Sequence, residues 1–125
     1  MILQHFIYKS QAFFYLIFIY LYMIMYKPLP EQVTIKESYI EGLGLFANED
    51  LSVNTKLGIS HVKDERFEHG YIRTPLGAFV NHSTAPNCEF YNDKDFIKLR
   101  TIRNINIGNE LTAEYWLYDL EEEND

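Results

Sequence analysis

A chain of 125 residues with 18 acidic and 11 basic side chains is long enough for one ordinary domain and carries a formal charge of −7. This excess of carboxylates argues against nucleic acid as the main ligand, because phosphate binding depends on clustered lysines and arginines. A cationic partner, such as a lysine-rich protein segment, fits the charge better. The single cysteine, Cys88, excludes an intrachain disulfide and fits a reducing compartment, so an intracellular location in the cytoplasm or nucleus is expected.

Residues 1–26 form a hydrophobic segment that differs from the rest of the chain. Within it, residues 12–26 read AFFYLIFIYLYMIMY and carry no charge. A helix of this length spans about 22 Å, which is short of the roughly 30 Å hydrocarbon core of a bilayer. No small-residue cleavage site follows, so a secretory signal is not expected. Three interpretations stay open: a marginal membrane anchor, an upstream stretch that is not part of the native protein, and an amphipathic or partner-binding helix.

Short strands separated by turns are predicted after residue 30, so the fold class is mostly β. The first, over 33–37, alternates apolar and polar residues as a half-buried strand does. Gly42 and Gly44 indicate a turn, because glycine adopts positive φ readily. Further strands are expected over 45–47, 56–59, 88–91, 96–102 and 110–113.

The remaining segments are predicted to be loops and a tail. The stretch 61–74 is polar, and His61 and His69 are expected to be solvated loop residues. Cys88 is expected to be a small buried residue rather than a nucleophile or a metal ligand. Residues 119–125 are rich in carboxylates and predict a frayed acidic tail. The tail follows a folded part whose bounds, 33–118, are those of the family resemblance described next.

Three segments, taken in order, form a specific pattern. They are residues 42–47 (GLGLFA), 81–88 (NHSTAPNC) and 110–115 (ELTAEY). Together they resemble the SET-domain methyltransferases, in the style of the minimal stand-alone members from viruses and bacteria. Residues 102–111 also look like the segment that leads into the family's catalytic tyrosine. The resemblance implies a SET-type fold of small β-sheets with a C-terminal pseudoknot, here preceded by the hydrophobic, helix-like segment.

The resemblance also implies a cofactor, S-adenosylmethionine, and residues that bind it. By analogy, the turn formed by Gly42, Leu43 and Gly44 lets the backbone approach the methionine part of the cofactor. Asn81 and His82 would hold the cofactor through side-chain and main-chain hydrogen bonds. The family's activity is methylation of lysine side chains, so a protein substrate with a target lysine is expected as the partner.

Tyr115 is identified by the same resemblance as the catalytic tyrosine, and it would also contact the cofactor. Methyl transfer from a sulfonium to an amine is an in-line displacement that needs alignment and exclusion of water. Free lysine has a pKa near 10.4 and must lose a proton before it attacks, which a nearby cation and an apolar channel both favour. Tyr115 would line that channel, with Trp116 and Tyr118 as further aromatic walls.

The chain departs from many members of the family after Tyr115. No cysteine cluster follows, so the zinc-binding segment that completes the channel elsewhere is missing, and no metal site is expected. Three candidates to close the channel stay open: the acidic tail, the amino-terminal segment and a second subunit. A homodimer that covers the surface around residues 116–118 is expected. Two other functions compete: a catalytically inactive β-domain that binds a peptide or protein partner, and a membrane-anchored structural protein.

Overall fold

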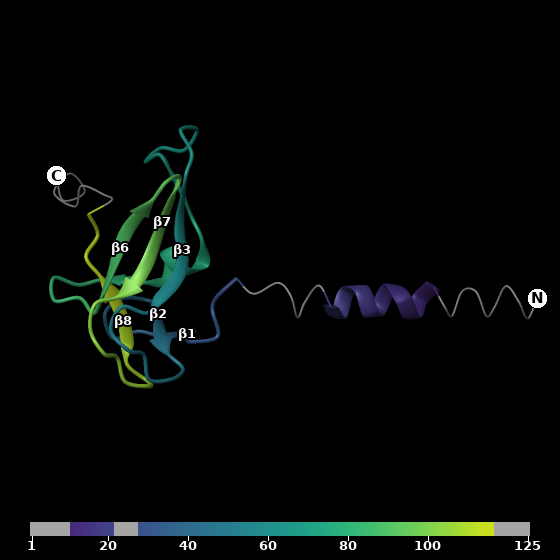
Figure 1. Cartoon of the computed structure of the whole chain (residues 1–125), viewed down its shortest axis with the longest axis horizontal. Coiled ribbons are helices and arrows are strands. Elements are labelled where there is room, and N and C mark those ends of the chain that lie inside the picture. Colours follow the sequence, from purple (N-terminus) through teal and green to yellow (C-terminus); the bar gives the residue numbers. More distant parts are fainter. Residues whose placement is uncertain (1–10, 22–27, 117–125) are drawn as a thin grey trace, which may run out of the picture.

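The computed structural model describes residues 11–21 and 28–116, and their ordered elements are mostly strands (Figure 1). In chain order these are β1 (Val33–Glu37), β2 (Leu43–Ala47), β3 (Lys56–Lys63), β4 (Tyr71–Arg73), the helix α2 (Pro75–Phe79), β5 (Asn81–His82), β6 (Cys88–Asp93), β7 (Phe96–Thr101) and β8 (Glu110–Ala113). Residues 11–21 form a helix whose side chains are all exposed. In the described part of the chain, no helix has the length and apolar character needed to span a membrane.

The last strand, β8, occupies a central place in the sheet. The strands hydrogen-bond in the order β1-β2-β8-β6-β7-β3-β4, and β5 also pairs with β8. Strand β8 runs antiparallel to β2 and parallel to β5 and β6. Its neighbours all come earlier in the chain, so the final strand inserts between segments that are far apart in sequence. The mostly β architecture is confirmed, and β8 takes the inserted position that a C-terminal pseudoknot implies.

The hairpin of β6 and β7 shows why these residues form strands. Along β7, Ile97 and Leu99 are fully buried, whereas Lys98 and Arg100 between them are partly exposed. This alternation places one face of the hairpin on the core and the other in water. Figure 1 shows β6, β7 and β3 side by side, with β7 in the middle.

Asn87 fastens β8 to the loop that precedes β6. Its side-chain amide donates to the carbonyl of Glu110 at 2.8 Å and accepts from the backbone N–H of Thr112 at 2.8 Å. Leu111 and Ala113, on the strand itself, are fully buried. Strand β8 is therefore held by apolar burial and by a side chain that satisfies its backbone groups.

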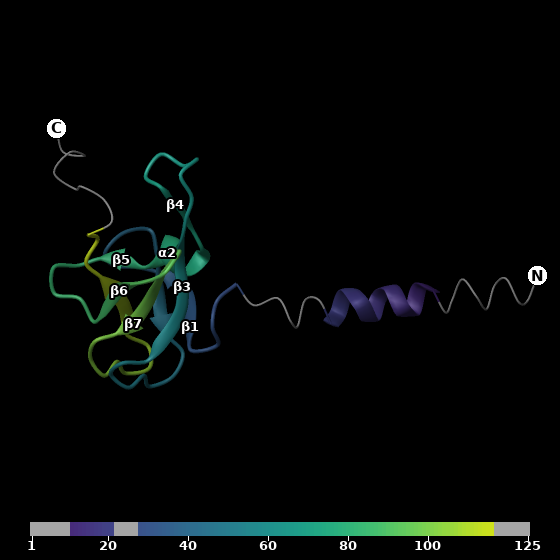
Figure 2. The same cartoon turned by 45° about the horizontal axis from the view of Figure 1, so that its top comes forward.

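Strand β3 is longer than the sequence predicted, and the prediction of a solvated loop at His61 is wrong. His61 is only 1% exposed. It lies opposite Arg73 in the antiparallel pairing of β3 with β4, so the polar stretch continues as a hairpin. Helix α2 lies against β3 (Figure 2). Tertiary contacts with β4 and α2 therefore decide the burial of His61.

Helix α2 forms where the sequence showed only a small apolar stretch. Thr74 caps it, since its hydroxyl accepts from the N–H of Gly77 at 3.4 Å, and Pro75 takes the first helical position.

Cys88 is fully buried, as predicted, and burial raises the pKa of its thiol to about 12. A thiol with such a pKa is inert at neutral pH.

Candidate active site

Asn81 joins all three sequence motifs through hydrogen bonds. Its side-chain nitrogen donates to Oε2 of Glu110 at 2.8 Å and to the hydroxyl of Ser38 at 3.0 Å. The same nitrogen reaches the backbone carbonyls of Glu41 at 3.1 Å and Leu43 at 3.4 Å. All these partners can accept, which assigns the nitrogen of this amide unambiguously. The amide oxygen, Oδ1, is therefore the atom that Asn81 can offer to a ligand.

The carboxylate of Glu110 is the centre of this network. The hydroxyl of Ser38 donates to its two oxygens, at 2.7 Å and 2.9 Å, beside the bond from Asn81. Ser38 precedes the turn, and its hydroxyl also accepts from the N–H of Ile40 at 2.9 Å. One carboxylate thus ties β8 to the turn before β2 and to β5.

The two glycines of the first motif are required for different structural reasons. Gly42 has φ of +48°, a conformation that L side chains rarely adopt, and a Cβ added there would meet nothing within 4 Å. Gly44 lies inside β2, where an added Cβ would come within 2.4 Å of Oε2 of Glu110 and 3.1 Å of Nδ2 of Asn81. Gly42 therefore shapes the turn and leaves open space beside it, while Gly44 makes room for the Glu110 carboxylate.

Tyr115 is held at its backbone and at its hydroxyl. Its N–H donates to Nδ1 of His82 at 3.0 Å, and the two rings lie 5.2 Å apart. Its hydroxyl donates to the carbonyl of Val80. Because Nδ1 of His82 accepts, the neutral ring carries its proton on Nε2. The second and third motifs therefore fix the tyrosine ring in one orientation.

A cluster of rings packs behind Tyr115. Phe90 lies 6.3 Å from Tyr115 and 5.3 Å from His61, and Tyr71 lies 6.0 Å from His61 (ring centroids). Burial and the nearby positive charge of Arg73 lower the pKa of His61 from 6.5 to about 4. Nδ1 of His61 bonds the hydroxyl of Ser60 at 2.9 Å. The aromatic cluster therefore contains a neutral imidazole at ordinary pH.

An open cleft of about 760 Å³ lies in front of Tyr115 and His82. Among the described residues its lining combines aromatic, apolar and charged side chains from the turn before β2, the β3–β4 hairpin, α2, β5 and the segment after β8. These are Glu41, Phe67, Glu68, His69, Tyr71, Ile72, Arg73, Ala78, His82 and Tyr115. A concave site with a few polar groups beside aromatic rings is the usual form of a ligand site.

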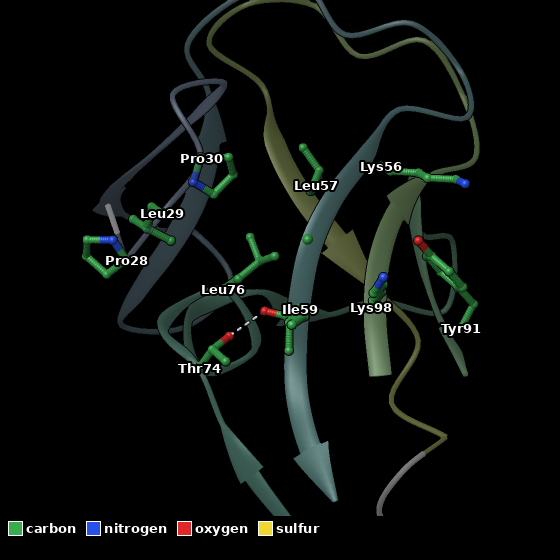
Figure 3. A pocket seen from close by; sticks show the side chains of 11 residues that line it. Pro28, Leu29, Pro30, Lys56, Leu57, Ile59, Thr74, Leu76, Tyr91 and Lys98 are labelled. Carbon is green, nitrogen blue, oxygen red and sulfur yellow. Dashed lines mark hydrogen bonds between the residues drawn. The ribbon is translucent and has the colours of Figure 1, made fainter. Parts of the chain in front are cut away.

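A second hollow, of about 540 Å³, lies between residues 28–30 and β3 (Figure 3). Leu57, Ile59 and Leu76 line it, and the hydroxyl of Thr74 donates to the carbonyl of Ile59 at 2.7 Å. None of the residues predicted from the motifs lines this hollow. We therefore take the cleft at Tyr115 as the candidate active site.

Of the residues predicted for the site, His82 and Tyr115 line the cleft. Asn81 bonds the carbonyl of Leu43 in the neighbouring network, but the described lining of the cleft does not include Gly42, Leu43, Gly44 or Asn81. Trp116 is 50% exposed and does not line the cleft, while Tyr118 lies outside the described residues. Sequence reasoning missed Ser38 and Arg73, because an isolated serine or arginine forms no pattern. In the described chain, no group of three or more histidine, cysteine, aspartate or glutamate side chains is placed to hold a metal ion.

The similarity to known proteins lies in sequence and in fold. Residues 60–116 match the family model of the SET domain. A candidate histone methyltransferase of Plasmodium falciparum has a similar structure, with 20% identity, a TM-score of 0.58, and coverage of 71% of this chain and 99% of that one. The methyltransferase domain of human PR domain-containing protein 2 gives 18% identity, a TM-score of 0.55, and coverage of 68% and 77%. None of the curated proteins matches the chain. The sequence match over residues 60–116, which include the second and third motifs, and the similar fold together support the resemblance to SET-domain methyltransferases.

Proposed function

We propose that the protein is an S-adenosylmethionine-dependent methyltransferase that methylates lysine side chains of a protein substrate. The observation that carries this proposal is the hydrogen-bond network that joins the three motifs beside a cleft lined by His82 and Tyr115. Asn81 bonds the carbonyl of Leu43 and the carboxylate of Glu110, while His82 holds the backbone of Tyr115. Segments separated by as many as 72 positions in sequence are thus joined beside one aromatic wall.

The residues at the cleft fit the proposed cofactor. Next to the lining residue Glu41, the open space beside Gly42 lets a ligand approach the backbone of the turn, and Oδ1 of Asn81, which bonds the Glu41 carbonyl through its nitrogen, can accept from a cationic amine. Glu41 and Glu68 give the cleft wall negative charge, which favours a sulfonium and an incoming lysine. When bound, the cofactor would supply an electrophilic methyl group on a sulfonium.

The protein's own residues would align the amine and exclude water. Tyr115 is fixed through His82 and Val80, so its ring presents one face to the cleft. Phe90 packs on it, 6.3 Å between ring centroids, and keeps the surroundings apolar. An apolar wall favours the neutral amine, the form that attacks carbon. Alignment of two reactants in this way lowers the barrier without acid or base catalysis.

Two measurements on the full chain test the proposal. Calorimetry with S-adenosylmethionine tests binding, and transfer of a labelled methyl group to mixed proteins, followed by hydrolysis to amino acids, tests lysine methylation. We expect saturable binding and label in methyl-lysine. Absence of both binding and transfer would contradict the proposal. Persistent peptide binding without cofactor binding would favour the alternative, an inactive β-domain that binds a partner.

A further inference from the structure

The charges that line the cleft are of both signs. Arg73 is the one lysine or arginine among the described lining residues, which also include two carboxylates, Glu41 and Glu68. In the part of the chain that the structure describes, no hydrogen bond or ion pair engages the Arg73 guanidinium. A guanidinium in a cleft of this size can bind a carboxylate through two parallel N–H···O hydrogen bonds.

The pairing of β4 with β3 places Arg73 on the side of the catalytic tyrosine. Arg73 lies directly opposite His61, and directly opposed residues project to the same face of a sheet. His61 contacts Phe90, and Phe90 contacts Tyr115. The effect of the Arg73 charge on His61 agrees with this placement. Ala78, a small residue, is also in the lining.

We infer that Arg73 binds the carboxylate of the methionine part of S-adenosylmethionine, so that the β3–β4 hairpin is part of the cofactor site. This inference rests on the proposed function. The reacting sulfonium must lie in front of Tyr115, and the amino-acid group is only a few bonds away, within the same cleft. Its ammonium then faces the acidic side, where Glu41 lies, and its carboxylate faces Arg73.

Binding of two nucleosides to the full chain tests the inference without turnover. One is S-adenosylhomocysteine, and the other is its decarboxylated analogue, which ends in the amine. The unaltered protein should bind the first about tenfold more tightly or better, which corresponds to about 1.4 kcal/mol, because a guanidinium and a carboxylate form charge-assisted hydrogen bonds. Arg73→Gln should bind both equally. Arg66→Gln is the matched control, because Arg66 lies in the same hairpin, pairs with Asp64 and does not line the cleft.

The outcomes separate this inference from the function on which it rests. A preference for the carboxylate that Arg73→Gln removes and Arg66→Gln retains supports it. Equal binding of the two nucleosides by the unaltered protein, or an unchanged preference in Arg73→Gln, overturns the role of Arg73 and leaves the proposed function standing. Failure of the unaltered protein to bind S-adenosylhomocysteine and S-adenosylmethionine overturns both.

Discussion

Tyr115 makes two separable contributions, its ring and its hydroxyl. The ring packs on His82 and Phe90, and the hydroxyl donates to the carbonyl of Val80. Tyr115→Phe keeps the ring, so we expect cofactor affinity near normal and methyl transfer at least about tenfold slower, or about 1.4 kcal/mol in the barrier. Calorimetry and labelled transfer measure the two effects. Tyr91→Phe, on the other hollow, should change neither, and equal turnover in Tyr115→Phe would remove its hydroxyl from the chemistry.

His61 makes the stability of the domain depend on pH. Its pKa in the folded protein is about 4, below the 6.5 of a free histidine, so the unfolded chain binds more protons between these values. The free energy of unfolding should therefore fall as the pH drops from about 6.5 towards 4, by at most about 3 kcal/mol from this residue. Urea unfolding at a series of pH values measures the slope. His61→Gln should flatten it, and an unchanged slope in His61→Gln would contradict this role.

At the scale of elements, the turn into β2 depends on two glycines with different requirements. In Gly44→Ala the added Cβ forces the Glu110 carboxylate to move and give up bonds to Ser38 and Asn81. We expect a loss of about 1–3 kcal/mol in stability together with weaker cofactor binding. Gly42→Ala meets no atom and should cost only the left-handed backbone conformation, about 1 kcal/mol. A larger stability loss in Gly42→Ala than in Gly44→Ala would contradict this assignment.

Asn87 provides a test of how β8 is held. Asn87→Ala removes a donor to the Glu110 carbonyl and an acceptor for the Thr112 N–H, both part-buried. Leaving these backbone groups unsatisfied should lower the free energy of unfolding by about 2–4 kcal/mol. Chemical unfolding monitored by tryptophan fluorescence measures it. Asn92→Ala, on an exposed position of β6, is the control and should stay within about 0.5 kcal/mol of the unaltered protein.

The sequence predicted the elements whose signal is local. The alternation of apolar and polar residues located β1, and the glycines located the turn before β2. Helix α2 was missed because five residues with a glycine are too short to show a helical period. The burial of His61 was missed because β4 and α2, rather than neighbours in sequence, cover it. The requirement for Gly44 is likewise spatial, set by Glu110 from the far end of the chain.

Only the site residues that belong to the three sequence motifs could be predicted. Asn81, His82 and Tyr115 were found because three motifs in one order are specific, and their mutual bonds follow from the fold. The amide nitrogen of Asn81 donates hydrogen bonds to the turn and to Glu110, and these bonds depend on distances between separate strands. No spacing in the sequence contains that information. The roles assigned to these residues in cofactor binding stay predictions until ligand binding is measured.

At the scale of the whole molecule, removal of residues 1–24 tests whether the domain folds without them and whether it forms a homodimer. Every motif lies after residue 41, so a chain that starts at Met25 should fold and bind S-adenosylmethionine. We expect it to form a homodimer through the surface around Trp116, which is half-exposed. Light scattering and calorimetry on this shortened chain measure both. An insoluble product would make residues 1–24 part of the fold, and an active monomer would contradict the dimer.

The central position of β8 also governs when the protein can fold during synthesis. A nascent chain that has reached residue 109 contains β2 and β6, but the strand that joins them does not yet exist. Until residues 110–113 leave the ribosome, the edges of β2 and β6 stay open to other chains, and the carboxylate that anchors Ser38 and Asn81 is absent. The domain is therefore completed only after residues 110–113 have been made, and Tyr115 reaches the cleft in the same step.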